Sequence, residues 1–150
     1  ITYGHIDVIK KSLNIFDRLI VATTDNINKN YYFPIDERID IINNSLFKDL
    51  KFNKKKIKVV SFDNLTIDLC IKYNANAIIR GLRAVSDFEY EFQLAGMNKK
   101  LNSKIETMFL MSDVENQIIS SKFVKEIASL GGNINRFVTK YAVTMLKNKS

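Results

Sequence analysis

The order of apolar segments along the chain constrains its fold more than any other feature. Four short apolar runs have the length and β-branched content of strands, and between them apolar residues recur at helical spacing. Strands are predicted at residues 18–24 (RLIVATT), 57–62 (IKVVSF), 77–80 (AIIR) and 106–112 (ETMFLMS), and helices at residues 4–16, 35–46, 65–73, 86–101, 120–130 and 135–147. Such alternation with short connections predicts one α/β domain over the 150 residues, with a parallel sheet flanked by helices.

The predicted helix at residues 86–101 is apolar on two of its sides. Ser86 and Glu89 form a capping-box pattern at its start. Tyr90, Leu94, Met97 and Leu101 fall on one side, and Phe88, Phe92 and Ala95 fall on another. A helix with such a pattern is buried either in the core or in a subunit interface.

Polar residues collect where the predicted strands end. His5 lies in the first turn of the first helix, Lys29 follows the first strand, Arg80 and Arg83 flank Gly81 after the third, and Ser120 and Ser121 open a later helix. In a parallel α/β sheet these loops face one edge, where helix N–H groups, hydroxyls and cations suit a polyphosphate. The chain has neither a Walker A motif nor G-x-G-x-x-G. Taken singly, each residue also fits a structural role: a surface histidine, salt-bridge arginines and serine N-caps.

The net charge of +7 favours an anionic partner, either nucleic acid or a phosphorylated metabolite. The densest basic run is KFNKKKIK at residues 51–58, and no aromatic pattern interleaves with it, which weakens a single-strand nucleic-acid interpretation. A single cysteine, Cys70, excludes an intramolecular disulfide, and no apolar run reaches the roughly 18 residues of a membrane span. We therefore expect a cytoplasmic protein that binds no membrane.

Two long segments carry a family resemblance. ITYGHIDVIKKSLNIFD and IRGLRAVSDFEYEFQLAGMN, with IISS downstream, closely resemble bacterial phosphopantetheine adenylyltransferases, nucleotidyltransferases of the [T/H]-x-G-H class. The resemblance implies a Rossmann-like nucleotidyltransferase fold and transfer of AMP from ATP to 4′-phosphopantetheine with Mg²⁺, giving dephospho-coenzyme A and pyrophosphate. It also implies a homohexamer and, as a further ligand, coenzyme A acting as a feedback inhibitor.

The resemblance assigns roles to residues that match the family motifs. His5 would hydrogen-bond the α-phosphate as charge develops there, next to Thr2 at the first motif position. Lys29 would contact both the acceptor phosphate and the transferring group, and Thr66 and Arg80 would bind phosphopantetheine. The ATP-binding set comprises His5, Gly81, Leu82, Arg83, Glu91, Asn116, Gln117, Ile118, Ile119, Ser120, Ser121 and Lys122.

The chain departs from the family pattern in two places. The family's first strand and its G-[S/T]-F-D-P loop are expected about a dozen residues before Ile1, at the centre of the sheet. Asn116 and Lys122 stand where relatives carry an aromatic residue and a serine. Two alternatives stay open at this stage: a sister nucleotidyltransferase with another acceptor, and a basic nucleic-acid-binding module.

Overall fold

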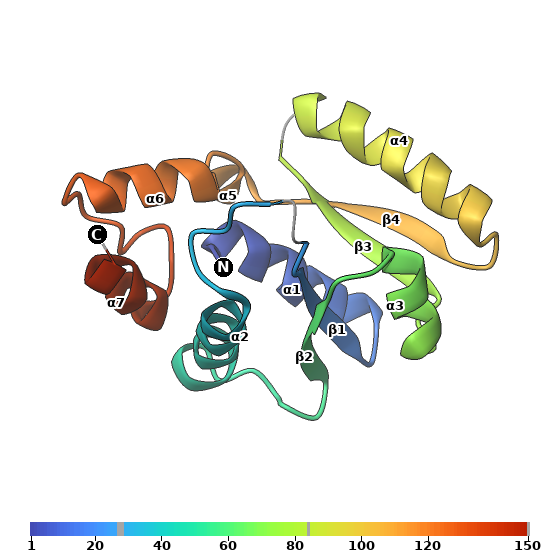
Figure 1. Ribbon diagram of the computed structural model, residues 1–150, viewed down its shortest axis with the longest axis horizontal. Helices are drawn as coiled ribbons and strands as arrows, with labels where there is room; N and C mark the ends of the chain where they lie inside the picture. The colour runs from blue at the N-terminus through green and yellow to red at the C-terminus, as the bar shows by residue number, and fades with distance from the viewer. Residues whose placement is uncertain (27–28, 84, 150) are drawn as a thin grey trace.

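The computed structural model describes residues 1–26, 29–83 and 85–149 (Figure 1). Strands and helices alternate along the chain, as the sequence predicts. The strands are β1 (Leu19–Thr24), β2 (Ile57–Phe62), β3 (Ala77–Leu82) and β4 (Glu106–Met111). The helices are α1 (Tyr3–Ile15), α2 (Ile35–Asn43), α3 (Thr66–Lys72), α4 (Val85–Leu101), α5 (Val114–Gln117), α6 (Ser121–Ser129) and α7 (Lys140–Lys149).

The four strands pair in parallel, which confirms the predicted α/β class, but they form two sheets of two strands. β1 pairs with β2 from Leu19↔Ile57 to Thr24↔Phe62, and β3 pairs with β4 from Ala77↔Glu106 to Leu82↔Met111. Consecutive residues of β1 and β3 line a cleft between the two sheets, at the central position where the sequence predicts the family's first strand. β1 is therefore only half-buried along most of its length, although its continuous apolar run predicts burial on both faces.

Helix α1 joins the two halves, because it packs against β1, β3, β4 and α5 (Figure 1). Its buried residues Ile6 and Ile9 form one core cluster with Leu46 and Ile57. A second cluster fills the space between α2, α6 and α7, and a third lies between α3 and the β3–β4 sheet. The cleft therefore lies between separately packed cores.

Three helices differ from the sequence-based prediction at their ends. The helix predicted at residues 35–46 continues from α2 into a π-helical turn, η1 (Asn44–Asp49), which buries Leu46 completely. α7 begins at Lys140 rather than near residue 135, because a turn at residues 135–137 lets Ile134 and Val138 on either side of it be buried in the core, and the Thr139 hydroxyl lies 2.6 Å from that of Ser45. α4 begins at Val85, one residue before the predicted cap Ser86, whose side chain lies outside the described residues. The four-residue α5 was not predicted, since one turn carries no periodic signal.

Helix α4 is not buried in the core of this chain. Phe88 packs edge-on against Phe109 of β4, with ring centroids 6.0 Å apart. Tyr90, Phe92 and Met97 are each more than 60% exposed, so the core alternative for this helix is wrong and the interface alternative stays a prediction. Among the described residues, no helix combines the length and apolar character needed to cross a bilayer.

Candidate active site

The cleft between the two sheets is the largest cavity of the molecule near the predicted site, with a volume of about 1640 Å³. His5, Thr66, Arg80, Gly81, Arg83, Glu91, Ile119, Ser120, Ser121 and Lys122 all line it. Lysine and arginine outnumber carboxylates along its wall by ten to two; the cations are Arg18, Arg38, Lys54, Lys55, Lys56, Lys58, Arg80, Arg83, Lys122 and Lys125. Of these cations, Arg80 and Arg83 lie near His5, whereas Arg18 and the four lysines at 54–58 lie at the starts of β1 and β2, at the other end of the strands.

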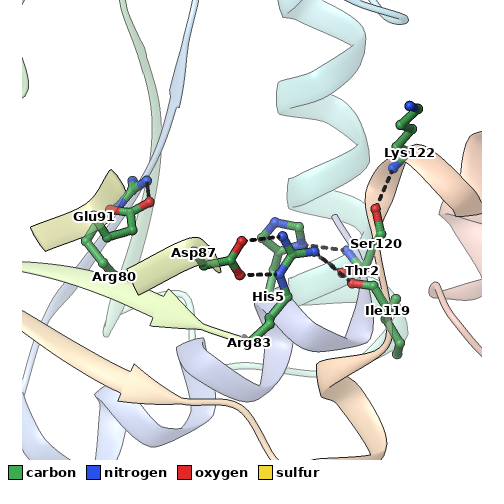
Figure 2. Close-up of polar contacts among 9 residues, drawn as sticks. All are labelled: Thr2, His5, Arg80, Arg83, Asp87, Glu91, Ile119, Ser120 and Lys122. Atoms are coloured by element: carbon green, nitrogen blue, oxygen red, sulfur yellow. Dashed lines mark hydrogen bonds and ion pairs between the residues drawn. The ribbon is translucent and has the colours of Figure 1, made fainter. Parts of the chain in front are cut away.

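His5 makes a hydrogen bond within its own helix, and this bond fixes which ring nitrogen carries the hydrogen. It occupies the third position of α1, and its Nδ1 accepts the backbone N–H of the N-cap residue Thr2 at 3.1 Å (Figure 2). The Thr2 hydroxyl also lies 2.8 Å from Nδ1. Because Nδ1 accepts, the neutral ring carries its hydrogen on Nε2. His5 therefore caps its own helix and still has one N–H to donate.

The surroundings keep His5 neutral. Its ring opens onto the cleft, but protein encloses its other sides, and this desolvation is the main cause that lowers its pKa from 6.5 to about 4. The positive charges of Arg83 and Arg80 lower the pKa further. At neutral pH the ring is therefore a hydrogen-bond donor without a charge of its own.

Arg80 is held by a carboxylate of α4. Its Nε and Nη2 donate to the two oxygens of Glu91 at 2.7 Å and 2.6 Å (Figure 2). This bidentate bond raises the pKa of Arg80. The Glu91 side chain is 12% exposed and that of Arg80 is 43% exposed, so the guanidinium keeps an open side while the carboxylate is covered.

Arg83 bridges α4 and the segment before α6. Its guanidinium lies between the Asp87 carboxylate, at 3.0 Å and 3.2 Å, and the Ile119 carbonyl, at 3.3 Å (Figure 2). Gly81 brings this part of β3 close to α1, because a Cβ there would lie 2.7 Å from Cγ2 of Val8. The glycine therefore sets how near the two arginines lie to the helix of His5.

The start of α6 forms another wall of the cleft. Ser120 is its N-cap, and the Ser120 hydroxyl accepts the Lys122 N–H at 3.3 Å (Figure 2). This confirms the structural reading of Ser120 as a cap and leaves the remaining first-turn N–H groups facing the cleft. Such a helix start favours bound negative charge.

Several predicted site residues lie elsewhere. Of the described residues, the cleft lining does not include Lys29, Leu82, Asn116, Gln117 or Ile118. Lys29 lies exposed in the loop after β1, and Leu82 is buried in β3. The Gln117 amide donates to the Ser112 carbonyl at 2.9 Å, and Ile118 is 80% exposed. Substrate contacts from these five residues stay predictions.

Sequence reasoning missed a charged cluster that joins α1 to the turn after β4. It consists of Asp7, Lys11 and Asp113. The acid–base pair four residues apart on one helix was the available signal. No sequence pattern links this pair to Asp113, which lies more than a hundred residues further along the chain.

The described residues contain no group of three or more His, Cys, Asp or Glu side chains arranged to hold a metal ion. The two carboxylates in the cleft, Asp87 and Glu91, are both bonded to arginines. A divalent cation at this site would therefore take most of its ligands from a bound polyphosphate and water.

Comparison with known proteins gives a consistent result. A family model described as cytidylyltransferase-like matches residues 1–127. The phosphopantetheine adenylyltransferase of Pelagibacter ubique (strain HTCC1062) is 65% identical over 149 residues, covering 99% of this chain and 91% of the relative. The enzymes of that name from Sphingopyxis alaskensis and Legionella pneumophila (strain Lens) are both 48% identical, over 93% and 99% of this chain and 80% and 85% of the relatives.

Proposed function

The chain belongs to the phosphopantetheine adenylyltransferase family of cytidylyltransferase-like proteins, and on that premise we propose how its cleft performs adenylyl transfer. The enzyme transfers AMP from ATP to 4′-phosphopantetheine and forms dephospho-coenzyme A and pyrophosphate. The acceptor phosphate attacks the α-phosphorus of ATP, the bond between the α-phosphorus and the bridging oxygen breaks, and pyrophosphate leaves. Alignment and charge stabilisation supply most of the catalysis of such a step.

One observation carries this proposal: a histidine that is neutral near pH 7 lines the cleft close to Arg80 and Arg83, with Nδ1 already bonded to Thr2. Nδ1 of His5 is engaged by Thr2, so the hydrogen lies on Nε2. As negative charge develops on the α-phosphate oxygens, this N–H donates a hydrogen bond that strengthens toward the transition state. The lowered pKa of His5 ensures that the ring presents this same tautomer across the neutral pH range.

The arginines and the start of α6 bind the phosphates on either side of the α-phosphorus. Arg80, held bidentately by Glu91, offers the open side of its guanidinium to the acceptor phosphate. Arg83 and the first-turn N–H groups of α6 face the ATP phosphates. Because both oxygens of Glu91 are used by Arg80, its contribution is to orient that arginine; a direct contact with the adenylate stays a prediction.

Mg²⁺ would be held mainly by phosphate oxygens of ATP and by water. Its preference for phosphate oxygens and water matches a cleft whose carboxylates are already paired with arginines. When bound, the ion neutralises charge on the triphosphate and on the leaving pyrophosphate.

The assembly and regulation implied by the resemblance are part of the proposal. The exposed apolar residues of α4 support a homo-oligomer, which we propose to be a hexamer that works in the cytoplasm. Coenzyme A shares the phosphopantetheine arm of the acceptor, so it fits the same cleft as a competing inhibitor.

The direct test is pyrophosphate release from ATP in the presence of one acceptor at a time. With 4′-phosphopantetheine the chain releases pyrophosphate, and with nicotinamide mononucleotide or without an acceptor the rate falls at least about 100-fold, the scale set by losing an oriented reaction partner. Release with nicotinamide mononucleotide at the same rate would instead identify a sister nucleotidyltransferase.

A further inference from the structure

A charged cluster, Asp7, Lys11 and Asp113, ties α1 to the turn between β4 and α5; we call it the α1 clamp. Nζ of Lys11 donates to the Met111 carbonyl and to the Asp113 carboxylate, both at 2.7 Å. The Asp7 carboxylate lies 3.2 Å from the same Nζ and accepts the backbone N–H of Asp113 at 2.7 Å. The clamp therefore bonds both backbone groups of the turn and the side chain of Asp113.

Asp7 is the most buried residue of the clamp. Its side chain is 10% exposed, against 32% for Lys11 and 61% for Asp113. The hydrogen bond to Asp113 is the main cause that raises the pKa of Lys11, and its counterpart lowers the pKa of Asp113. An exposed ion pair alone contributes little to stability, but removing the partner of a buried carboxylate that also accepts a backbone N–H costs more.

The clamp leads directly to the ATP side of the cleft. Asp113 is the N-cap residue of α5, and its carbonyl accepts the N–H groups of Asn116 at 2.8 Å and Gln117 at 3.1 Å. The Asn116 carbonyl then accepts the Ile119 N–H at 3.1 Å, and the Ile119 carbonyl accepts from Arg83. Each link fixes the next, from Asp113 to the start of α6.

The other end of the clamp lies two residues from His5 on the same helix. We propose that Asp7 and Lys11 are positioning residues that hold residues 119–122 at the correct distance from His5 for ATP to bind across both. This inference rests on the proposed adenylyl transfer and adds residues that touch no substrate. Arg80, on β3, is held by α4 and has no bond to the clamp among the described residues. The clamp therefore acts on ATP and not on the acceptor.

The test uses adjacent lysines on α1. Lys11→Met removes the clamp's cation and keeps the length of the side chain, and Lys10→Met is the matched control at an exposed position. Calorimetry on the full chain measures the ATP dissociation constant, and steady-state kinetics measures KM for both substrates. Lys11→Met raises the ATP dissociation constant and KM about tenfold and leaves KM for the acceptor within about twofold, because misplacing a binding wall weakens only the ligand that bridges it.

Two further variants separate positioning from general stability. Lys11→Arg keeps both donors and restores most of the ATP affinity, and Asp7→Asn keeps an acceptor for the Asp113 N–H and gives an intermediate loss of about threefold. The melting temperature of Lys11→Met stays within about 2 °C of the unaltered chain, since ion pairs of partly exposed side chains contribute little to stability.

An equal loss of affinity for both substrates, an equal effect of Lys10→Met, or unchanged ATP binding in Lys11→Met would overturn the proposal. Calorimetry needs ATP alone, so it does not depend on turnover. If the unaltered chain bound ATP and released no pyrophosphate, the proposed function would fail while the comparison of Lys11 with Lys10 kept its meaning.

Discussion

At the scale of single residues, His5 serves the helix and the reaction with different atoms of one ring. Nδ1 accepts from the N-cap residue Thr2, and Nε2 is left with the hydrogen. The structural and the catalytic interpretation of this histidine therefore do not compete. They also separate experimentally, because glutamine at the same helical position supplies the capping acceptor without the imidazole.

Substitution of His5 by glutamine and by alanine tests this division. Both variants lower kcat about 100-fold, the usual scale for losing one donor to the transition state. ATP affinity changes by less than about threefold, since the bond strengthens only as charge develops. His5→Ala alone also loses about 1 kcal/mol of stability with the cap. Stopped-flow kinetics and thermal unfolding measure the two effects, and a glutamine variant with more than about a third of the normal kcat would assign His5 to the cap only.

The lowered pKa of His5 predicts a pH-dependent stability. Its pKa is about 4 in the folded chain and 6.5 when exposed, so on acidification the unfolded chain takes up this proton first. The stabilisation is complete above pH 6.5 and is lost as the pH falls toward 4. The His5→Gln variant has no imidazole at this position and takes up no such proton. As the pH falls from 6.5 to 4, the melting temperature of the unaltered chain therefore drops more than that of His5→Gln. Equal drops of the two melting temperatures over this range would contradict the lowered pKa.

At the scale of elements, the approach of β3 to α1 decides where the arginines lie. A Cβ at Gly81 would lie 2.7 Å from Cγ2 of Val8, so Gly81→Ala forces the strand and the helix apart. We expect a loss of about 1–3 kcal/mol in the free energy of unfolding, together with a lower kcat. Adding Val8→Ala opens space and recovers part of the loss, so the two substitutions are not additive. Urea unfolding of the four proteins measures the coupling, and additive losses would show that this contact is not the cause.

The elements show which parts of the structure a sequence can predict. The bounds of β2 agree with the prediction and those of β1 differ from it by one residue, because apolar β-branched runs bounded by polar residues carry a local signal. The start of α7 depends on the burial of Ile134 and on the bond between Thr139 and Ser45, which no local pattern encodes.

The candidate site follows the same rule. His5, Arg80, Arg83 and Ser120 meet at the cleft because each follows from a helix start or a strand end. The α1 clamp was not predictable, since Lys11 and Asp113 become neighbours only through the packing of α1 against α5. The pairing of Glu91 with Arg80 likewise requires the position of α4 over β3.

At the scale of the whole molecule, the positive charge and the apolar surface occupy different places. The cations near His5, Arg80 and Arg83, line the cleft and favour bound phosphates there. Helix α4 lies on the outer side of the β3–β4 sheet (Figure 1), and several of its large apolar side chains are exposed. A surface of this kind is typical of an interface between subunits.

The α4 surface predicts that a charge placed on it dissolves the assembly. Met97 is 61% exposed on α4, and Gln93, one turn away, is an exposed polar residue of the same helix. Met97→Glu shifts the mass measured by light scattering from about six times 17.3 kDa toward smaller species, because burying an unpaired carboxylate in an apolar interface is costly. Gln93→Glu lies on the same side of the helix and is expected to act in the same direction, whereas Asn148→Glu on α7 changes the charge equally at an exposed position and leaves the assembly intact. A mass of 17.3 kDa for the unaltered chain at micromolar concentration would refute the interface.

The central claim is that the cleft around His5 transfers the adenylyl group, and the fate of the α-phosphate of ATP tests it most directly. ATP carrying radioactive phosphorus at the α position is incubated with the chain, Mg²⁺ and 4′-phosphopantetheine. The account predicts that the label enters dephospho-coenzyme A, with one unlabelled pyrophosphate released per transfer, and that His5→Gln does this about 100-fold more slowly. Label recovered in free AMP or ADP, or pyrophosphate released at the same rate without the acceptor, would contradict it.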